Sequence, residues 1–299
     1  MYKYWGFGLH IISEIEFPEL LPTDFDHAQL TISIGKVPQD LEGEKVIRRP
    51  FSIIGHQEYV LNLNSVAKYY AGHGHTIIVE PVVDENLDSI RLFLLGTVMA
   101  AILYQRKSIP LHASAIEKDG KLILFTGNSG VGKSTLLANL ATRGFQVFTD
   151  DICVLNHDKD QKIVFGIASY PMLKLWEDAL TKINSDSYTT ENKIRPHLPK
   201  YAQFFHKTFN TKMLPVEKVF ILQISNNENI THQTLSNVAA FKNVERQAYK
   251  YRLTSGDILR PEHFSVMSAL VNQTQVITIK RPHYGTTINE FCDIIEKLF

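Results

Sequence analysis

The fold is decided by one stretch of the sequence, Gly127-Asn128-Ser129-Gly130-Val131-Gly132-Lys133-Ser134, which fits the pattern G-x-x-x-x-G-K-[ST]. An apolar run of strand-forming residues (122–126) comes directly before it, and a helix-forming run (135–140) follows. Glycines let main-chain N–H groups converge on phosphate oxygens, and the start of a helix adds partial positive charge. This setting therefore predicts a nucleotide-phosphate site, whose cofactor-binding residues are expected to be Gly127, Asn128, Ser129, Gly130, Val131, Gly132, Lys133, Ser134 and Thr135.

Four side chains, two in the loop and two after a later strand, give this site its expected chemistry. Lys133 is placed to reach the outer phosphates, and the Ser134 hydroxyl is placed to ligate Mg²⁺. Asp150 and Asp151 end the predicted strand 145–149, and carboxylates at the carboxyl end of a strand point toward a nucleotide crevice. One carboxylate can hold the metal while the other accepts a proton from an attacking hydroxyl, so ATP and Mg²⁺ are the expected cofactors. A simple turn or helix-capping role for the Asp pair is the alternative.

Composition limits the classes of partner. The chain has 299 residues, enough for one large domain or two ordinary ones, and we expect two. Lys plus Arg (31) equals Asp plus Glu (31), which argues against binding to nucleic acid or an anionic membrane. Cys153 and Cys292 are far apart and lack metal-ligand spacing, which suits a reducing cytosol. The opening residues lack a continuous apolar signal segment, and the longest apolar run (92–104) is shorter than the roughly 20 residues that span a bilayer. We therefore expect a cytoplasmic protein in which this run is a buried helix.

The predicted organisation is α/β (α+β), with a β-rich N-terminal domain at residues 1–85 and a phosphate-loop catalytic domain at 86–299. A helix at 87–105 is expected to link them. Short strands such as 30–34, 59–63 and 76–80 mark the first domain. The sequence Gly72-His73-Gly74-His75 is interpreted as a turn between strands, because two histidines alone are a poor set of metal ligands.

In the second domain, the pattern predicts strands at 110–116, 152–155, 163–167, 216–224 and 275–279, with His112 on the strand beside the loop strand. Helices are expected at 171–180, 239–251, 261–271 and 287–299, the first of them carrying Trp176. Residues 181–212 are polar and weakly periodic, so we expect loops that act as a lid or substrate-docking segment.

The ordered set of motifs resembles a known family. His112 in Leu-His-Ala-Ser, the loop 127–134 and the pair Asp150-Asp151 resemble the catalytic domain of HPr kinase/phosphorylase in order and approximate spacing. That family shares its nucleotide fold with ATP-type phosphoenolpyruvate carboxykinases and phosphorylates serine in a small carrier protein. The whole chain is more similar to HPr-kinase-like enzymes of peptide-modification clusters, including lasso peptide pathways, which phosphorylate a precursor peptide. This wider similarity rests on residues 4–22, Gln105-Arg106, Leu175-Trp176 and Arg281-Pro282.

The resemblance implies a role for each matching residue. Asp150 would be the base, Asp151 the metal-side acid and His112 a supporting site residue, although the two Asp roles could be exchanged. The family usually has Glu directly after the loop serine, where this chain has Thr135, which makes the reverse phosphorolysis reaction doubtful. Its later arginine-glycine motif is not recognisable here. Lys212 is the predicted stand-in for a phosphate-stabilising cation, with Arg195 and Lys207 as substitutes and a solvated surface lysine as the alternative reading.

The sequence therefore predicts an ATP-dependent serine kinase acting on a peptide or protein. Two alternatives remain open: a kinase for a small molecule such as free serine, and a non-catalytic nucleotide-binding module. A GTPase is disfavoured because Asn192-Lys193-Ile194-Arg195 lacks the Asp of a guanine-reading N-K-x-D motif. A homo-oligomer is neither predicted nor excluded.

Overall fold

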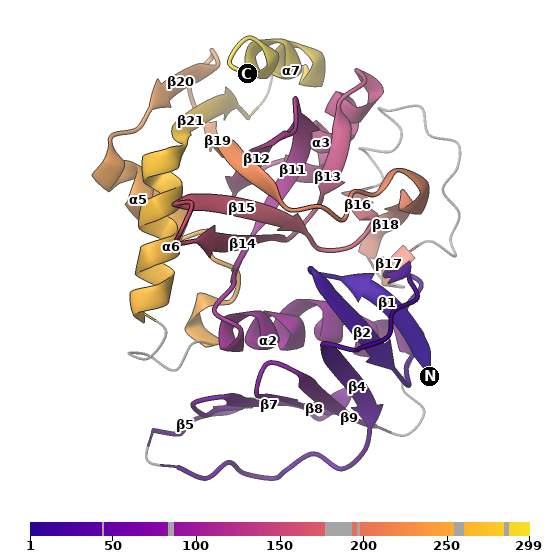
Figure 1. Cartoon of the computed structure of the whole chain (residues 1–299). Coiled ribbons are helices and arrows are strands. Elements are labelled where there is room, and N and C mark those ends of the chain that lie inside the picture. The colour runs from indigo at the N-terminus through magenta and orange to yellow at the C-terminus, as the bar shows by residue number, and fades with distance from the viewer. Residues whose placement is uncertain (44, 83–86, 177–192, 196–197, 254–259, 284–286) are drawn as a thin grey trace. The chain divides into compact units, whose positions relative to one another are not determined.

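The computed structural model describes residues 1–43, 45–82, 87–176, 193–195, 198–253, 260–283 and 287–299 (Figure 1). The chain divides into two compact units. Unit 1 comprises Met1–Pro110 and Tyr249–Phe264, and unit 2 comprises Leu111–Ala248 and Ser265–Phe299. Helices and several sheets occur together, so the predicted mixed α/β class is confirmed.

Unit 1 is built on a mixed sheet in the order β3-β1-β2-β4-β9-β8-β7-β6-β5. Its strands are β1 (Tyr2–Gly6), β2 (Leu9–Ser13), β3 (Leu21–Pro22), β4 (Leu30–Ile34), β5 (Ile47–Arg49), β6 (Ser52–Ile54), β7 (Glu58–Leu63), β8 (Ala67–Gly72) and β9 (Thr76–Pro81). The strands predicted at 30–34, 59–63 and 76–80 are β4, β7 and β9. The predicted turn joins β8 to β9, because His73 (φ 55°) and Gly74 (φ 72°) both adopt the left-handed conformation of a tight hairpin.

The predicted helix at 87–105 is present as α1 (Leu87–Phe93), a π-helical turn (Leu94–Val98) and α2 (Met99–Gln105). At 19 residues it is longer than its apolar run and, by length and composition alone, could cross a bilayer. More than half of it is nevertheless buried within the protein, and Gln105 Nε2 donates a hydrogen bond to the Ala71 carbonyl of β8. It is therefore a core helix of unit 1, as expected from the sequence, which predicted a buried helix here.

A late segment of the chain completes unit 1. Tyr249 N donates to Pro110 O (2.7 Å), and the Tyr104 hydroxyl donates to Tyr249 O (2.9 Å). Unit 1 therefore holds both the helix 87–105 and residues after 248, whereas the predicted boundary lay at residue 85. The predicted boundary therefore differs from the boundary between the two compact units. No local feature of the sequence signals that residues 249–264 return to unit 1.

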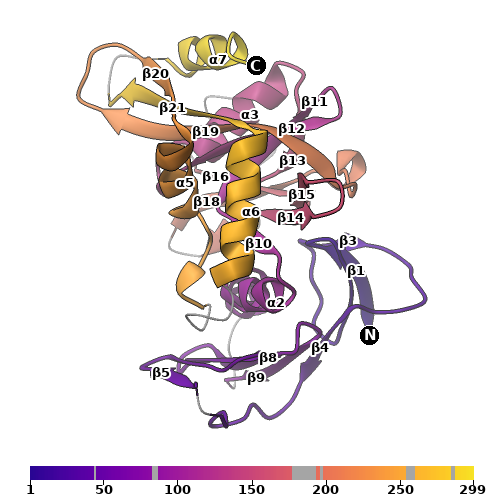
Figure 2. The same ribbon diagram turned by 60° about the vertical axis from the view of Figure 1, so that its left-hand side comes forward.

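The chain enters unit 2 within β10 (Ile109–Leu111), and the main sheet of unit 2 has the order β14-β15-β19-β12-β11-β13, with β21 also paired to β19 and β20 to β21. Its strands are β11 (Ala113–Lys118), β12 (Lys121–Gly127), β13 (Gln146–Thr149), β14 (Cys153–Asp158), β15 (Ile163–Ala168), β19 (Leu214–Ser225), β20 (Thr231–Thr234) and β21 (Gln275–Pro282). β12, β19 and β21 are parallel, and β13 runs in the same direction because both it and β12 are antiparallel to β11. The carboxyl ends of these four strands therefore meet at one edge of the sheet (Figure 2).

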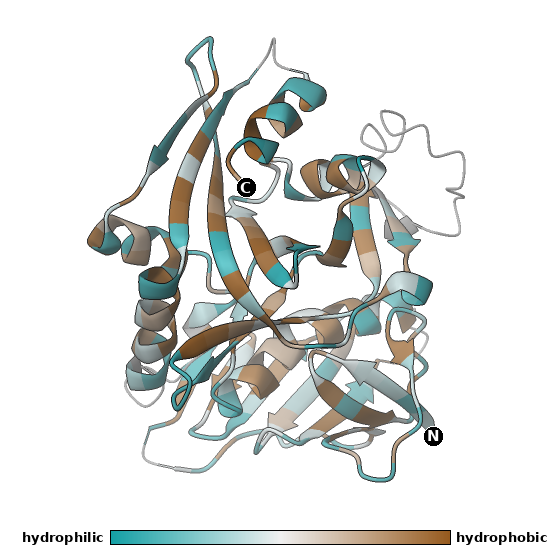
Figure 3. Cartoon of the chain, turned by 45° about the horizontal axis from the view of Figure 1, so that its top comes forward, coloured by the Kyte–Doolittle hydropathy of each residue, from teal (hydrophilic) through white to brown (hydrophobic). Residues whose placement is uncertain are grey.

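Helices cover this sheet and bury its apolar side chains. α3 (Lys133–Thr142) and α7 (Ile288–Glu296) share one hydrophobic cluster with the strands, which contains Phe125, Leu136, Leu140, Phe220, Phe291 and Ile295. Bands of apolar residues run along the strands (Figure 3), and in β12 the run from Leu122 to Phe125 is completely buried. A capping box formed by Thr287 and Glu290 starts α7. The other helices are α5 (Asn237–Glu245) and α6 (Arg260–Gln273), and single turns occur at His206–Thr208 and Tyr251–Leu253.

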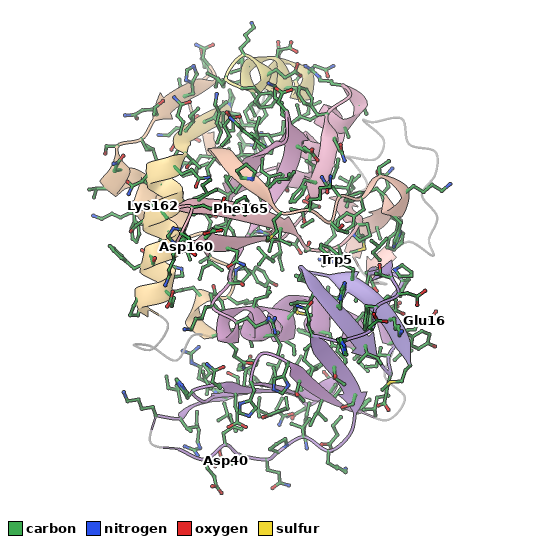
Figure 4. All side chains as sticks on the ribbon, viewed as in Figure 1. Trp5, Glu16, Asp40, Asp160, Lys162 and Phe165 are labelled. Carbon is green, nitrogen blue, oxygen red and sulfur yellow. The ribbon has the colours of Figure 1, made fainter. Side chains whose placement is uncertain are left out.

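The helix predicted at 171–180 is wrong for its described part. Residues Met172–Trp176 form strand β16, which pairs with β18 (Leu198–Phe204) in a small sheet that also contains β17 (Lys193–Arg195). Pairing with β18, which is remote in sequence, satisfies the main chain of β16 and so overrides its local helical pattern. Residues 198–204 of the predicted lid are likewise a strand, in which Tyr201 is buried, whereas 181–192 lie outside the described residues. A turn carrying Asp160 and Lys162 joins β14 to β15 (Figure 4).

Candidate functional site

The glycine loop, defined here as residues 127–134, joins the carboxyl end of β12 to the start of α3. At Gly127 (φ 143°) a β-carbon would stand 2.5 Å from the Leu222 carbonyl oxygen, so no side chain fits. Gly132 has φ 103° and caps α3, a left-handed conformation that glycine adopts without strain. The first N–H groups of a helix have no partner within it. This loop therefore presents main-chain donors at the carboxyl edge of the sheet.

The Lys133 side chain is folded over this loop. Its ammonium donates to the carbonyl oxygens of Gly127 (2.8 Å) and Asn128 (3.3 Å), and the residue is only 7% exposed. A lysine so enclosed, beside main-chain N–H donors, makes a strongly electropositive cradle that suits an anionic group.

Asp150 is buried beside the start of α3. Its Oδ1 accepts hydrogen bonds from the hydroxyls of Ser114 (2.6 Å) and Ser134 (3.1 Å), and its Oδ2 accepts from the main-chain N–H of Lys174 (3.0 Å). The residue is 1% exposed. Three donors hold this buried carboxylate rigidly against Ser134.

Asp151 faces a different set of partners. Its Oδ2 lies 2.6 Å from Lys174 Nζ, and its Oδ1 lies 3.3 Å from His112 Nδ1. His112 Nδ1 is also 2.9 Å from the Asp151 carbonyl oxygen, which can only accept, so this nitrogen carries the ring proton. The Asp151 side chain is 25% exposed, and its φ of 70° is a strained conformation for a residue with a side chain. Asp151 is thus the accessible carboxylate of the pair.

The ion pair between Asp151 and Lys174 keeps both groups charged. Burial by itself raises the pKa of Asp151, but the charge of Lys174 and the hydrogen bond from His112 outweigh it and hold that pKa well below its ordinary value. Burial lowers the pKa of Lys174, but attraction to Asp151 outweighs it and raises that pKa well above its ordinary value. At neutral pH this part of the site is therefore a carboxylate bound to an ammonium.

The structure brings together most of the residues that the sequence singled out. His112, Lys133, Ser134, Asp150 and Asp151 meet at the carboxyl edge because β11 starts there and β12 and β13 end there. The sequence assigned the metal to Ser134 and Asp151, whereas in the structure the Ser134 hydroxyl donates its hydrogen bond to Asp150.

The prediction for Lys212 is wrong. Lys212 precedes β19, whose Val216 lies opposite Leu122 at the amino end of β12, so it sits at the far edge of the sheet. At about 3.3 Å per residue, this is on the order of 20 Å from the glycine loop. The side chain is exposed. Lys207 is also exposed, on a turn whose Thr208 carbonyl contacts Gln146 at the start of β13, and the Arg195 side chain lies outside the described residues.

Sequence reasoning missed Ser114 and Lys174. Ser114, on β11, stands two residues after His112, and in the extended chain expected there the two side chains share a face, which was an available signal. Lys174 was hidden by the helical interpretation of its segment. Read as a strand, Met172-Leu173-Lys174-Leu175-Trp176 contains one charged residue in an otherwise apolar run, a pattern that marks a buried functional lysine.

Among the residues that the structure describes, no group of three or more His, Cys, Asp or Glu side chains could hold a metal ion. Mg²⁺ nevertheless needs few protein ligands, because it keeps several waters and takes oxygens from substrate phosphates. Ser134 Oγ and Asp150 Oδ1 are two such oxygens only 3.1 Å apart at the start of α3. They fit a Mg²⁺ site completed by a nucleotide.

Comparison with known proteins gives one local similarity. No family model matches the chain. Over 94 residues it is 35% identical to the HPr kinase/phosphorylase of Latilactobacillus sakei subsp. sakei (strain 23K). These 94 residues are 31% of this chain and 28% of that protein. The chain thus matches less than a third of the length of this relative. The solved Hpr(Ser) kinase/phosphatase of Coxiella burnetii is similar over 63% of this chain and 92% of that one, with 14% identity and a TM-score of 0.34, too low to support an argument.

Proposed function

We propose that the protein is an ATP- and Mg²⁺-dependent kinase that phosphorylates a serine hydroxyl of a peptide or protein. The observation that carries this proposal is the pair of differently held carboxylates beside the glycine loop. Asp150 is locked against Ser134, and Asp151 is accessible and paired with Lys174. A protein that only binds nucleotide needs one metal-side acid, whereas transfer to a hydroxyl uses a second. The local similarity to an HPr kinase/phosphorylase supports the same chemistry.

The nucleotide side of the reaction belongs to the glycine loop. Its main-chain N–H groups and the Lys133 ammonium bind the outer phosphates, with Lys133 exchanging its bonds to Gly127 and Asn128 for phosphate oxygens. Ser134 and Asp150 hold Mg²⁺. When bound, the metal neutralises phosphate charge and orients the transferred group. This assigns the metal-side role to Asp150, the reverse of the order expected from the resemblance.

The acceptor side belongs to Asp151, His112 and Lys174. The Asp151 carboxylate accepts a hydrogen bond from the serine hydroxyl, whose oxygen attacks the γ-phosphorus while the bond from that phosphorus to the leaving ADP oxygen breaks. The hydroxyl proton passes to Asp151. Because the pKa of Asp151 is so low, this carboxylate orients the hydroxyl more than it activates it. His112 and Lys174 fix its orientation, so catalysis rests mainly on positioning and charge.

For the acceptor, we propose a ribosomally made precursor peptide of the lasso type, and a carrier protein or free serine are the competing substrates. The test is to incubate the protein with Mg²⁺-ATP and a panel of serine-containing peptides, or with free serine, and to follow a phosphate mass shift by mass spectrometry. Matched peptides with Ala in place of Ser are the control. Transfer to peptides but not to free serine supports the proposal, and the opposite result identifies a small-molecule kinase.

Metal dependence provides a second test of the same proposal. A chelator should abolish transfer, and added Mg²⁺ should restore it, because Mg²⁺ bound through the oxygens of Ser134 and Asp150 would take its remaining ligands from phosphate and water. Transfer that continues without a divalent metal would contradict the assigned metal site. A protein that binds ATP but modifies no acceptor would instead be a non-catalytic nucleotide-binding module.

A further inference from the structure

One arginine contacts the glycine loop from outside the motif. Arg281 lies near the carboxyl end of β21, the strand next to β19, at the same edge as the loop. Its Nη2 donates to the Val131 carbonyl oxygen (3.2 Å) and its Nη1 to the Pro282 carbonyl oxygen (3.1 Å). Nη2 is also 3.7 Å from the point where a β-carbon on Gly132 would stand. The guanidinium is therefore directly against the fifth and sixth residues of the loop.

Within the part of the chain that the structure describes, the charge of Arg281 is not balanced by a carboxylate. Among the described residues, no carboxylate lies within ion-pair distance of it, whereas Arg143 and Arg91 each contact two. A guanidinium carries five N–H donors, and the two carbonyl contacts use two of them. Burial lowers the pKa of Arg281, which still leaves it charged at neutral pH. A partly buried, unpaired cation is costly unless an anion joins it.

We propose that Arg281 is a positioning residue of the nucleotide site that braces the glycine loop at Val131 and supplies a fixed positive charge for the polyphosphate of the nucleotide. This rests on the proposed function, because it assumes that the loop binds a nucleoside triphosphate. The brace orders the main-chain donors of the loop, and the unpaired charge attracts the ligand more strongly as its own negative charge rises.

Salt dependence distinguishes a charge role from a purely structural one. Loss of a brace alone disorders the loop N–H groups that bind the outer phosphates, so it also weakens ATP more than AMP, but by the same factor at low and high salt. Loss of a charge weakens a ligand in proportion to its negative charge, so the effect should grow from AMP to ADP to ATP. A single charge-assisted contact of this kind corresponds to roughly a 10–100-fold change in affinity for ATP.

The experiment measures dissociation constants of AMP, ADP and ATP, with Mg²⁺, by calorimetry for the parent, Arg281→Gln and Arg281→Lys. The control is Lys280→Gln, which removes the same charge from the exposed neighbouring residue. We expect Arg281→Gln to weaken the binding of ATP about 10–100-fold, to weaken the binding of ADP less, and to change the affinity for AMP by no more than about threefold. The loss of ATP affinity should shrink at high salt. Arg281→Lys should keep most of the parent's difference in affinity between ATP and AMP. Lys280→Gln should bind all three nucleotides with nearly the affinity of the parent.

A loss of ATP affinity in Arg281→Gln that is the same at low and high salt would overturn the charge role. Unchanged affinities would overturn the inference as a whole while leaving the proposed function intact. If Arg281→Gln does not fold, as judged by its circular dichroism and melting temperature, the same series in Arg281→Lys decides. In that variant the ATP preference must persist for the inference to hold. A parent protein that binds no nucleotide would overturn the proposed function itself, and this inference with it.

Discussion

The two edges of the main sheet in unit 2 are made by the same strands but hold their charged side chains in very different surroundings. At the far edge, Lys121 pairs with Glu217 at 2.9 Å, with side chains 51% and 40% exposed. At the site edge, Asp150 and Lys133 are almost completely buried, and Asp151 pairs with Lys174. Water screens exposed charges, so such pairs contribute little, whereas the same groups interact several-fold more strongly when enclosed. Only the site edge can therefore bind an anion tightly and change its reactivity.

The largest contrast is expected from removing the enclosed lysine of the site edge. Lys133→Ala should reduce phosphoryl transfer by roughly 10³–10⁵-fold, because its charge neutralises the transferred group. Circular dichroism should show that the variant stays folded. Transfer to a peptide, followed by mass spectrometry, is the measurement. A folded variant that transfers phosphate at the parent rate would show that the glycine loop has another role.

Replacing each of the two carboxylates of the site edge by Asn should have a different effect on phosphoryl transfer and on ATP–Mg²⁺ affinity. Asp151→Asn should reduce transfer by about 10²–10⁴-fold while ATP–Mg²⁺ affinity stays within a few-fold, because a group on the acceptor acts mainly in the transition state. Asp150→Asn should weaken Mg²⁺-dependent ATP binding as well, because a metal-side acid also supports the bound ground state. Calorimetry and transfer assays on both variants test this, and the opposite pattern would restore the role order expected from the resemblance.

The ion pair between Asp151 and Lys174 should contribute to stability over a wide pH range. The lowered pKa of Asp151 gives stability that is present above its ordinary pKa and lost as pH falls through the folded value. The raised pKa of Lys174 gives stability that is present below its ordinary pKa and lost as pH rises through the folded value. Between about pH 5 and pH 9 both contributions are complete, so the cost of breaking the pair should not vary with pH in that window.

Lys174→Met should therefore lower the free energy of unfolding by roughly 2–4 kcal/mol across that window, because it leaves Asp151 enclosed without its main counter-charge. Urea unfolding at several pH values is the measurement. The matched control is Lys118→Met, which breaks the exposed pair with Asp119 and should change stability little. Equal effects of the two substitutions would show that the two edges do not differ in the way described.

The smallest effect is expected at the far edge. Lys212→Ala should change transfer by less than about twofold and leave ATP affinity unaltered, because the side chain is solvated and remote from the glycine loop. Kinetic assays beside Lys133→Ala make the comparison direct. A loss of tenfold or more in Lys212→Ala would mean that residues of the far edge reach the nucleotide after all.

Much of unit 2 was predictable because its signals are local. The glycine loop, the strand before it and the helix after it are contiguous, and the required φ values of Gly127 and Gly132 explain the residues found there. His112, Asp150 and Asp151 could be placed at one edge because each stands at the end of a recognisable strand. The small sheet was not predictable in the same way, because β16 is a strand only through its pairing with β18.

What the sequence by itself determined was the glycine loop between a strand and a helix, the mixed α/β class and most of the residues that meet at the site edge, since each depends on short-range pattern and backbone preference. What only the tertiary structure decided was which carboxylate meets Ser134, that Lys174 and not Lys212 is the enclosed cation, and that Arg281 rests on Val131. These contacts join residues 16, 23 and 150 positions apart. Strand order and register bring them together, and no local preference of the chain encodes those distances.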